Sequence, residues 1–411
     1  MTPEPCQKPI KLLKIIIQLI LAATGINFMT EYCNLRSQSC HTSADEEKLL
    51  FYDVNPGEGF NLSRDVYMRF AIMLVEAHKK GKFGWKLVLP PWYNMYHWKF
   101  DSGIPWEWSK FFDINELKSF TPVVELHEVF SKTKSDKLEI DTVFILNNFE
   151  NAFEGGSFKE KWKIANDCKQ NVQYWGYKNI SAKEVLCVQF QGQISKLWEL
   201  LSLHPNDKKV MVTHGEIPLH DRYGTKIFWD CRKSMKFNKN LIEVATKYIS
   251  SSLNCNETMC KNYLSVHWRR QDFARNRGND VPTIAGTAKQ IRKALKKLSG
   301  IEQVFIATDA SMSELSELKR ELTMSNCEIH LFLPNPTLIE EYGDGGTAII
   351  DQIICSRAAY FLGTHESTFT YRIQEEREIL GFESNTTFNR LCPDVGLCKK
   401  PSKWTIVNDD I

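Results

Sequence analysis

The sequence lacks the short signatures of several common catalytic and metal-binding sites. It contains no Gly-x-x-x-x-Gly-Lys-Ser/Thr, no His-Glu-x-x-His, no Gly-x-Ser-x-Gly and no Cys-x-x-Cys. A P-loop, a zinc peptidase of that type, a hydrolase nucleophile elbow and a thioredoxin-like or zinc-ribbon site therefore lack support. Asp-x-Asp is also absent, so we expect neither an essential metal nor another cofactor, and arginine with a helix N-terminus would have to neutralise a bound phosphate.

Charge of one sign and long apolar runs are equally scarce. The 411 residues carry a formal net charge of +2, which gives no broad basic field, so nucleic acid is not an expected partner. After residue 25 no window of about 18 residues is apolar throughout, so we expect no stable membrane insertion of the mature chain.

The amino terminus has the pattern of a secretory signal. An apolar run at residues 15–23 follows the lysines Lys8, Lys11 and Lys14, and small residues stand at Ala23 and Gly25. We predict a signal peptide at residues 1–25, followed by an irregular lead-in at residues 26–46. A signal anchor that stays in the membrane is the alternative, although the run is short for a membrane span.

The cysteines fit an oxidising compartment. Of the 12 cysteines, Cys6 falls in the predicted signal, and the remaining odd number leaves at least one thiol free. Short loops make Cys33/Cys40, Cys255/Cys260 and Cys392/Cys398 natural local pairs, but spacing alone leaves the pairing of Cys33, Cys40, Cys231, Cys255, Cys260 and Cys327 open. Cys355 lies in an apolar helical stretch and is expected to be a buried thiol.

Sequons for N-glycosylation occur at Asn61, Asn179, Asn256 and Asn385. We expect the sequon at Asn61 to be unused because it lies in a glycine-rich loop, and the other three to be candidates for glycosylation. Together with the signal segment, the sequons and cysteines predict a soluble protein of the endoplasmic reticulum lumen.

Strands and helices alternate along much of the chain. The expected strands are 49–54, 86–89, 263–268, 304–307, 329–333 and 360–362; the expected helices are 63–78 with Ser63 as its cap, 240–251, 287–298, 313–322, 346–358 and one from Thr368. This alternation predicts an α/β fold of doubly wound parallel sheets. We divide it into two Rossmann-like domains that face a central cleft, residues 47–239 and 240–411.

Four features follow predicted strands or open predicted helices, where parallel sheets bind ligands. Glu58 is the acidic residue of a glycine-rich loop and fits either a general base or a solvated loop residue. His267 and Arg269 end a strand, and the arginine fits a phosphate ligand or a surface ion pair. Asp351 could accept hydrogen bonds from a base or ribose, or lie on a helix surface. Ser367-Thr368-Phe369 could bind phosphate at a helix start or only cap the helix.

Longer segments resemble those of the GDP-fucose protein O-fucosyltransferases, of the kind that modifies thrombospondin type 1 repeats rather than EGF-like domains. The segments are residues 52–61, 88–92, 266–273, 307–309, 344–352, 367–369 and 375–381. They span about residues 48–404, in the order expected for this family. The resemblance implies a GT-B fold in which residues 47–239 carry the catalytic loop and the acceptor side, and residues 240–411 bind GDP-fucose.

The resemblance also implies roles for individual residues. Glu58 would be the catalytic base of an inverting transfer to Ser or Thr, and Arg269 would stabilise the leaving GDP. The other implied donor-binding residues are Gly59, Asn61, His267, Asp351, Ser367, Thr368 and Phe369. Cys168–Cys187 and Cys392–Cys398 match the disulfides of the family. The expected partners are GDP-fucose and folded thrombospondin type 1 repeat proteins, the enzyme itself being a monomer.

Two other functions remain open at this stage. One is a fucosyltransferase of the same fold that acts on a glycan, whose sugars the aromatic segment 92–112 could stack. The other is a non-catalytic folding factor that binds the repeats, against which the presence of both Glu58 and Arg269 argues.

Overall fold

The computed structural model describes residues 47–408, except residues 56, 99–102, 104, 134–135, 151–152, 155–156, 256–259, 279, 299 and 324–326. The predicted signal peptide and the lead-in, residues 1–25 and 26–46, lie outside the described residues, as does the sequon asparagine Asn256. Residues from Glu47 onward form one compact unit.

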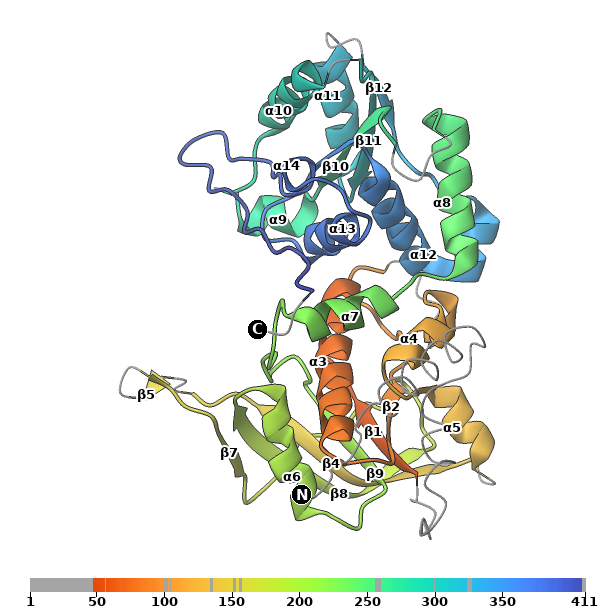
Figure 1. Cartoon of the computed structure of the whole chain (residues 1–411), viewed down its shortest axis with the longest axis vertical. Helices are drawn as coiled ribbons and strands as arrows, with labels where there is room; N and C mark the ends of the chain where they lie inside the picture. Colours follow the sequence, from red (N-terminus) through yellow and green to blue (C-terminus); the bar gives the residue numbers. More distant parts are fainter. Residues whose placement is uncertain are drawn as a thin grey trace, which may run out of the picture. The chain divides into compact units, whose positions relative to one another are not determined.

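In the described part of the chain, seven strands form the larger sheet (Figure 1). They are β1 (Lys48–Tyr52), β2 (Trp85–Leu89), β3 (Val123–Glu125), β4 (Leu138–Asn147), β7 (Lys161–Ile164), β8 (Ile180–Gln191) and β9 (Lys209–Thr213). The spatial order is β3-β2-β1-β9-β4-β8-β7, and every pairing is parallel except that of the edge strand β7 with β8. The last strand of this sheet in the sequence, β9, therefore lies in its centre, between β1 and β4.

A smaller sheet has four parallel strands among the described residues, in the order β12-β11-β10-β13. They are β10 (Tyr263–Trp268), β11 (Gln303–Thr308), β12 (Glu328–His330) and β13 (Tyr360–Leu362). A short antiparallel hairpin of β5 (Phe153–Glu154) and β6 (Ser157–Phe158) stands apart from both sheets. One cluster of buried apolar side chains includes members of both large sheets, such as Leu50, Phe144, Phe305 and Phe361.

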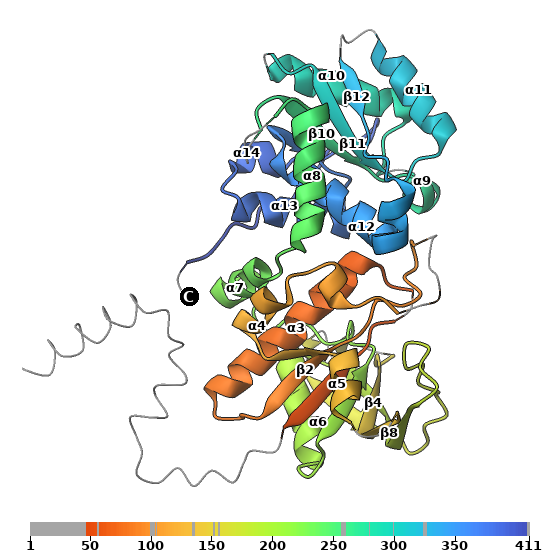
Figure 2. The ribbon, with the colours of Figure 1, turned by 90° about the vertical axis from the view of Figure 1, so that its right-hand side faces the viewer.

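The helices alternate with these strands. They are α3 (Phe60–Lys79), α4 (Ile114–Phe120), α5 (Leu126–Lys132), α6 (Leu197–Leu203), α7 (Lys226–Ser234), α8 (Lys239–Ser252), α9 (Gln271–Asn276), α10 (Ile284–Lys297), α11 (Met312–Leu322), α12 (Pro336–Arg357), α13 (Thr368–Ile379) and α14 (Ser384–Thr387), with the short turns η1 (Trp108–Lys110) and η2 (Ile194–Lys196). The helix α3 packs against β2, α7 and α13, and α8 lies along α12 (Figure 2).

Three predicted helix starts are wrong, one of them that of the helix expected at 287–298, which begins at Ile284 after its N-cap Thr283. The first helix begins at Phe60 with Gly59 as its N-cap, not at Ser63, whose hydroxyl instead donates back to the carbonyl oxygen of Gly59 at 3.3 Å. The helix expected at 346–358 begins at Pro336, with the Asn335 side chain accepting from a first-turn N–H, and it is kinked at Gly343. That glycine has φ +55°, an angle that residues with a Cβ rarely adopt. The helix therefore breaks locally at Gly343 and continues on both sides of it.

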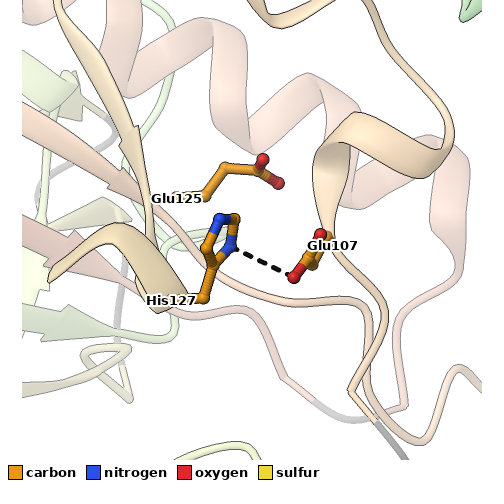
Figure 3. A group of neighbouring side chains, drawn as sticks. All are labelled: Glu107, Glu125 and His127. Atoms are coloured by element: carbon orange, nitrogen blue, oxygen red, sulfur yellow. Dashed lines mark ion pairs between the residues drawn. The ribbon is translucent and has the colours of Figure 1, made fainter. Parts of the chain in front are cut away.

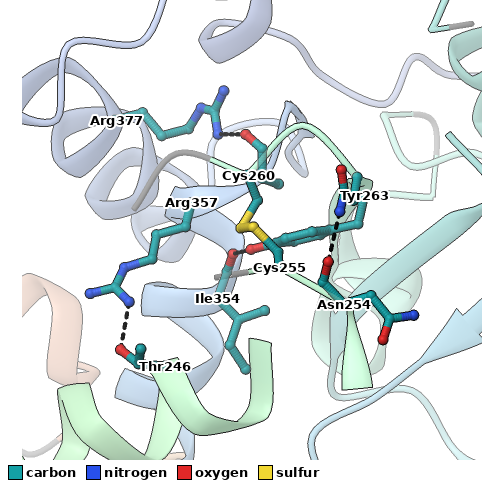
Figure 4. Close-up of a disulfide and its surroundings, with 10 residues drawn as sticks. Thr246, Asn254, Cys255, Cys260, Tyr263, Ile354, Arg357 and Arg377 are labelled. Atoms are coloured by element: carbon teal, nitrogen blue, oxygen red, sulfur yellow. Dashed lines mark hydrogen bonds between the residues drawn. A yellow bond between two sulfur atoms is a disulfide. The ribbon is translucent and has the colours of Figure 1, made fainter. Parts of the chain in front are cut away.

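The structure pairs three sets of cysteines among the described residues: Cys168–Cys187, Cys255–Cys260 and Cys392–Cys398. Cys231, Cys327 and Cys355 are free thiols, and Cys355 is buried as expected. Figure 4 shows the second disulfide between α8 and β10, beside the Tyr263 hydroxyl, which donates to the carbonyl oxygen of Ile354 at 2.6 Å. No helix in the described ranges is both long enough and apolar enough to cross a membrane.

Candidate active site

One cavity of about 610 Å³ gathers nearly all of the residues singled out in the sequence. It lies beyond the carboxyl ends of β1, β10 and β11 and at the N-termini of α3 and α13. The predicted site residues that line it are Glu58, Gly59, Asn61, His267, Arg269, Asp351, Ser367, Thr368 and Phe369. These residues meet at the carboxyl ends of the strands, because parallel strands direct those ends, and the loops that follow them, to one side of each sheet.

The loop after β1 presents Glu58 to this cavity. The backbone N–H of Glu58 donates to the carbonyl oxygen of Asn55 at 2.9 Å, and the Asn55 side chain accepts from the N–H of Gly57 at 3.3 Å. These bonds form a tight turn just before α3. Burial, and then the neighbouring carboxylate of Glu216, raise the pKa of Glu58 above its ordinary value. A carboxylate in such surroundings is a better proton acceptor once ionised.

Arg269 follows β10, lines the same cavity and is held by acidic groups. Its guanidinium lies 2.7 Å from a carboxylate oxygen of Asp272 and 2.7 Å from one of Asp309. The guanidinium also lies 3.1 Å from Nε2 of His97, and the backbone N–H of Arg269 donates to the Thr364 hydroxyl. Both ends of the residue are thereby fixed, with the charged end lining the cavity.

His267, one position before the buried Trp268, is itself buried and neutral. Its Nδ1 lies 2.8 Å from the hydroxyl of Thr370, and its ring stacks on Phe369 with 4.4 Å between the ring centroids. Burial, and then the charge of Arg269, lower the pKa of His267 to about 3. An uncharged imidazole can form a hydrogen bond with a ligand and adds no charge of its own beside it.

Asp351, on α12, reaches the cavity with an unsatisfied oxygen. Its Oδ1 is buried and has no hydrogen-bond partner within the described residues. Burial raises the pKa of Asp351 well above its ordinary value. A buried carboxyl without a partner is costly, so this position suits a ligand that brings its own N–H or O–H donors.

The start of α13 supplies backbone donors to the same cavity. Ser367 is its N-cap in extended conformation, and its side chain caps no backbone N–H. The first N–H groups of a helix have no partner within the helix and carry its positive dipole end. Ser367 and Thr368 therefore expose an anion-binding helix start rather than closing it, which favours the ligand-binding interpretation over capping alone.

Asn61 lies in the cavity wall but its side-chain oxygen is already occupied. It accepts from Nε2 of Gln352 at 2.8 Å and from Nη1 of the buried Arg64 at 3.3 Å. These bonds tie the first turn of α3 to α12. The other sequon asparagines of the described residues do not line the cavity. Asn179 precedes β8, Asn385 lies in α14, and both are exposed.

Sequence patterns alone did not indicate several residues of this site. His97, Asp272 and Asp309 contact Arg269, yet His97 is 172 positions away along the chain. His214 and Glu216 follow β9. Glu216 accepts a hydrogen bond from the N–H of Asn55 in the Glu58 loop, and His214 contacts Glu216. Asp272 and Asp309 stand in segments that carry the family resemblance, which was the available signal. His97 and Glu216 had none, because only the strand order brings them here.

A group that could hold a metal lies outside the lining of the cavity. Ligand atoms of Glu107, Glu125 and His127 all lie within 4.8 Å of one another (Figure 3). They already have partners: His127 Nδ1 lies 3.2 Å from Glu107, and Glu125 accepts from the N–H of Ser109 at 3.0 Å. The trio is thus accounted for by contacts within the protein.

Comparison with known proteins identifies related sequences. The family model described as GDP-fucose protein O-fucosyltransferase matches residues 49–380. Proteins named GDP-fucose protein O-fucosyltransferase 2 from Caenorhabditis elegans and Homo sapiens are each 37% identical over 89% of this chain, covering 92% and 91% of their own lengths. The relative from Drosophila melanogaster is 35% identical over 87% of this chain and 82% of its own.

Solved structures show the fold. The crystal structure of POFUT1 in complex with GDP has a TM-score of 0.57 at 18% identity and covers 84% of this chain and 98% of its own. The structure in complex with GDP-fucose has a TM-score of 0.56 at 16% identity, covering 86% and 98%. The α/β fold of GT-B type expected from the sequence is confirmed. The division at residues 239 and 240 stays a prediction.

Proposed function

The chain belongs to the family of GDP-fucose protein O-fucosyltransferases, and from this membership we propose that it transfers fucose to a Ser or Thr hydroxyl of folded thrombospondin type 1 repeats. As a member, the chain is an enzyme, a peptide-O-fucosyltransferase that uses GDP-fucose. The resemblance to this family implies that the transfer proceeds with inversion at the anomeric carbon.

One observation carries the proposal: Glu58 and Arg269 line the same cavity although they follow strands of two different sheets. Glu58 acts as the general base that removes the acceptor proton while the new bond forms. The bond between the fucose anomeric carbon and the diphosphate oxygen breaks with oxocarbenium-like charge. The leaving diphosphate gathers negative charge near Arg269 and the start of α13, which stabilise it.

The donor lies along the smaller sheet. Asp351 accepts from the nucleoside, for which its unpartnered Oδ1 is suited. Ser367 and Thr368 meet the diphosphate, and His267 with Phe369 forms a packed wall beside it. Because Arg269 and a helix start supply the positive charge, the reaction needs no metal.

The choice of acceptor rests on the motif segments that resemble the kind of enzyme modifying thrombospondin type 1 repeats. Relatives named O-fucosyltransferase 2, at 37% identity over 89% of the chain, support this branch. We further propose that the enzyme is a monomer in the endoplasmic reticulum lumen, where the three disulfides of the described residues can form.

The test is a transfer assay with labelled GDP-fucose and four conditions: a folded thrombospondin repeat, a folded EGF-like domain, a free glycan and no acceptor. We expect label on the repeat alone. Label on the glycan would favour a glycan-modifying enzyme instead. Tight binding of the repeat without any transfer would favour the folding factor.

A further inference from the structure

The segment after β9 is fitted tightly against the segment after β1. The two strands are parallel neighbours, so their carboxyl ends lie side by side. The N–H of Gly215 donates to the carbonyl oxygen of Asp53 at 2.8 Å. A Cβ at Gly215 would lie 2.8 Å from Phe70 and 3.1 Å from that same carbonyl oxygen, so only glycine fits. Its neighbour His214 has φ +56°, a left-handed conformation that further marks a constrained turn.

This fit brings Glu216 against the loop that carries Glu58. One carboxylate oxygen of Glu216 accepts from the backbone N–H of Asn55 at 3.1 Å, and the other lies 3.2 Å from Nδ1 of His214. The carbonyl oxygen of Asn55 in turn accepts from the N–H of Glu58 at 2.9 Å. Two hydrogen bonds therefore connect Glu216 to the backbone of Glu58. From α3, Arg69 fixes the other end of Glu216 by donating to its carbonyl oxygen at 2.8 Å.

We propose that Glu216 is a positioning residue for the reaction: it anchors the Glu58 loop through Asn55, and its pairing with His214 sets how strongly its charge acts on the Glu58 carboxylate. The inference rests on the proposed role of Glu58 as the base. Glu216 does not touch the reacting atoms, and neither it nor His214 belongs to the donor-binding residues described above.

The charges around this loop support such a role. Burial alone would raise the pKa of Glu216, but the His214 contact and backbone N–H donors lower it, so the residue is ionised. The hydrogen bond to Glu216 raises the pKa of His214. Burial raises the pKa of the adjacent Asp53 to about 7. Charged or titratable groups of the described residues near the loop include Asp53 after β1, His214 and Glu216 after β9, Arg69 from α3, and His97, which lies against Gly59 and contacts Arg269.

Glu216→Gln separates the two parts of the proposal. The amide oxygen can still accept from Asn55, so the loop should stay anchored and plateau turnover should fall by no more than about threefold. The negative charge beside Glu58 disappears, which lowers the pKa of Glu58. The acid limb of the pH–rate profile should therefore move to lower pH, by about half a unit. Glu216→Ala also loses the anchor, and turnover should fall by about tenfold or more.

His214→Asn should move the same limb in the opposite direction. Asparagine tolerates the left-handed backbone of this position and can still hydrogen-bond Glu216, but it cannot carry the compensating positive charge. The negative field of Glu216 on Glu58 then becomes stronger, so the acid limb should shift to higher pH. A purely structural role for either residue would lower turnover without these opposite shifts.

The matched control is Glu107→Gln. Glu107 and His127 form a second glutamate–histidine pair with the same 3.2 Å separation, but they do not line the cavity. This variant should leave the pH profile unchanged. GDP binding by calorimetry and a thermal melt confirm for each variant that the donor site and the fold are intact.

Glu58→Ala, measured alongside, distinguishes this inference from the proposed function. If that variant retains turnover, the base assignment fails and the positioning role falls with it. If Glu58→Ala is inactive while Glu216→Gln keeps the wild-type limb, or Glu216→Ala keeps wild-type turnover, only the positioning role is overturned.

Discussion

At the scale of single residues, the proposed proton acceptor and the proposed charge stabiliser stand on different segments of the chain. Glu58 has an upward-shifted pKa in a tight turn, whereas Arg269 stands between two carboxylates. Neither carboxylate partner of Arg269 comes from the loop that carries Glu58. The two groups can therefore be tested independently by mutation.

Glu58→Ala should abolish fucose transfer while GDP-fucose still binds. Removing a general base typically costs about 10²- to 10⁴-fold in rate, and the proposed donor contacts come from other residues. Turnover with a folded repeat and donor affinity by calorimetry measure the two effects. Near-wild-type turnover would show that another group takes the proton.

Arg269→Ala should lose most activity and also weaken donor binding. Arg269→Lys should recover only part of it, because an ammonium group cannot reproduce the planar fork that binds two oxygens of a phosphate. Kinetics with GDP-fucose and affinity for GDP report the two losses. Full recovery with lysine would mean that a point charge is enough.

At the scale of secondary structure, the site depends on close contacts between segments that end neighbouring strands. Thr370, in the first turn of α13, holds His267 from β10, and Thr364 holds the backbone of Arg269. Gly215, after β9, touches the end of β1 with no space for a side chain. Strand order and these contacts together determine where the candidate site residues lie.

Gly215→Ala should destabilise the protein by about 1–3 kcal/mol, because the new methyl group would overlap Phe70 and Val66 and displace the end of β1. Turnover should fall by more than the loss of folded protein accounts for, since the Glu58 loop begins at the end of β1. Gly278→Ala is the control: its added Cβ would have an ordinary contact at 3.5 Å, so stability should change by less than about 0.5 kcal/mol. Thermal melts and turnover of both variants decide; equal effects would contradict this account.

At the scale of the whole molecule, buried charges connect three helices beside the site. Glu375 of α13 pairs with Arg232 of α7 at 2.7 Å and with Arg372 at 3.0 Å, and Arg372 also lies 3.2 Å from Asp65 of α3. Removing one partner of such a network leaves an uncompensated buried charge. These contacts hold α13, whose N-terminus lines the cavity, against α3, the helix that follows Glu58.

Shape recognition of the acceptor also belongs to this scale. We expect transfer to an oxidised, folded repeat and little or none to its reduced form or to a short peptide. A folded module presents its hydroxyl in fixed geometry, whereas an unfolded chain has to be ordered on binding. Fucose incorporation into oxidised and reduced repeats measures the difference. Equal labelling of both would show that a linear motif suffices.

The sequence by itself predicted the fold class, which is confirmed, and the residues that line the cavity, whose chemical roles stay predictions. Glu58, Arg269 and Ser367 stand directly after strands or at a helix start, so the local pattern of apolar strands and the parallel topology were enough to place them at one edge, whereas Asp351 reaches the same cavity from within α12. The motif segments also predicted the family, which the comparisons confirm.

Only the tertiary structure decided which distant segments support that site. The strands β4, β8 and β9 are absent from those that the sequence predicts, and β9 inserts between β1 and β4. That insertion brings Glu216 to Asn55 across 161 positions, and His97 reaches Arg269 across 172. Local propensity cannot encode such pairings, because they depend on which strands bury one another's apolar faces in the folded chain.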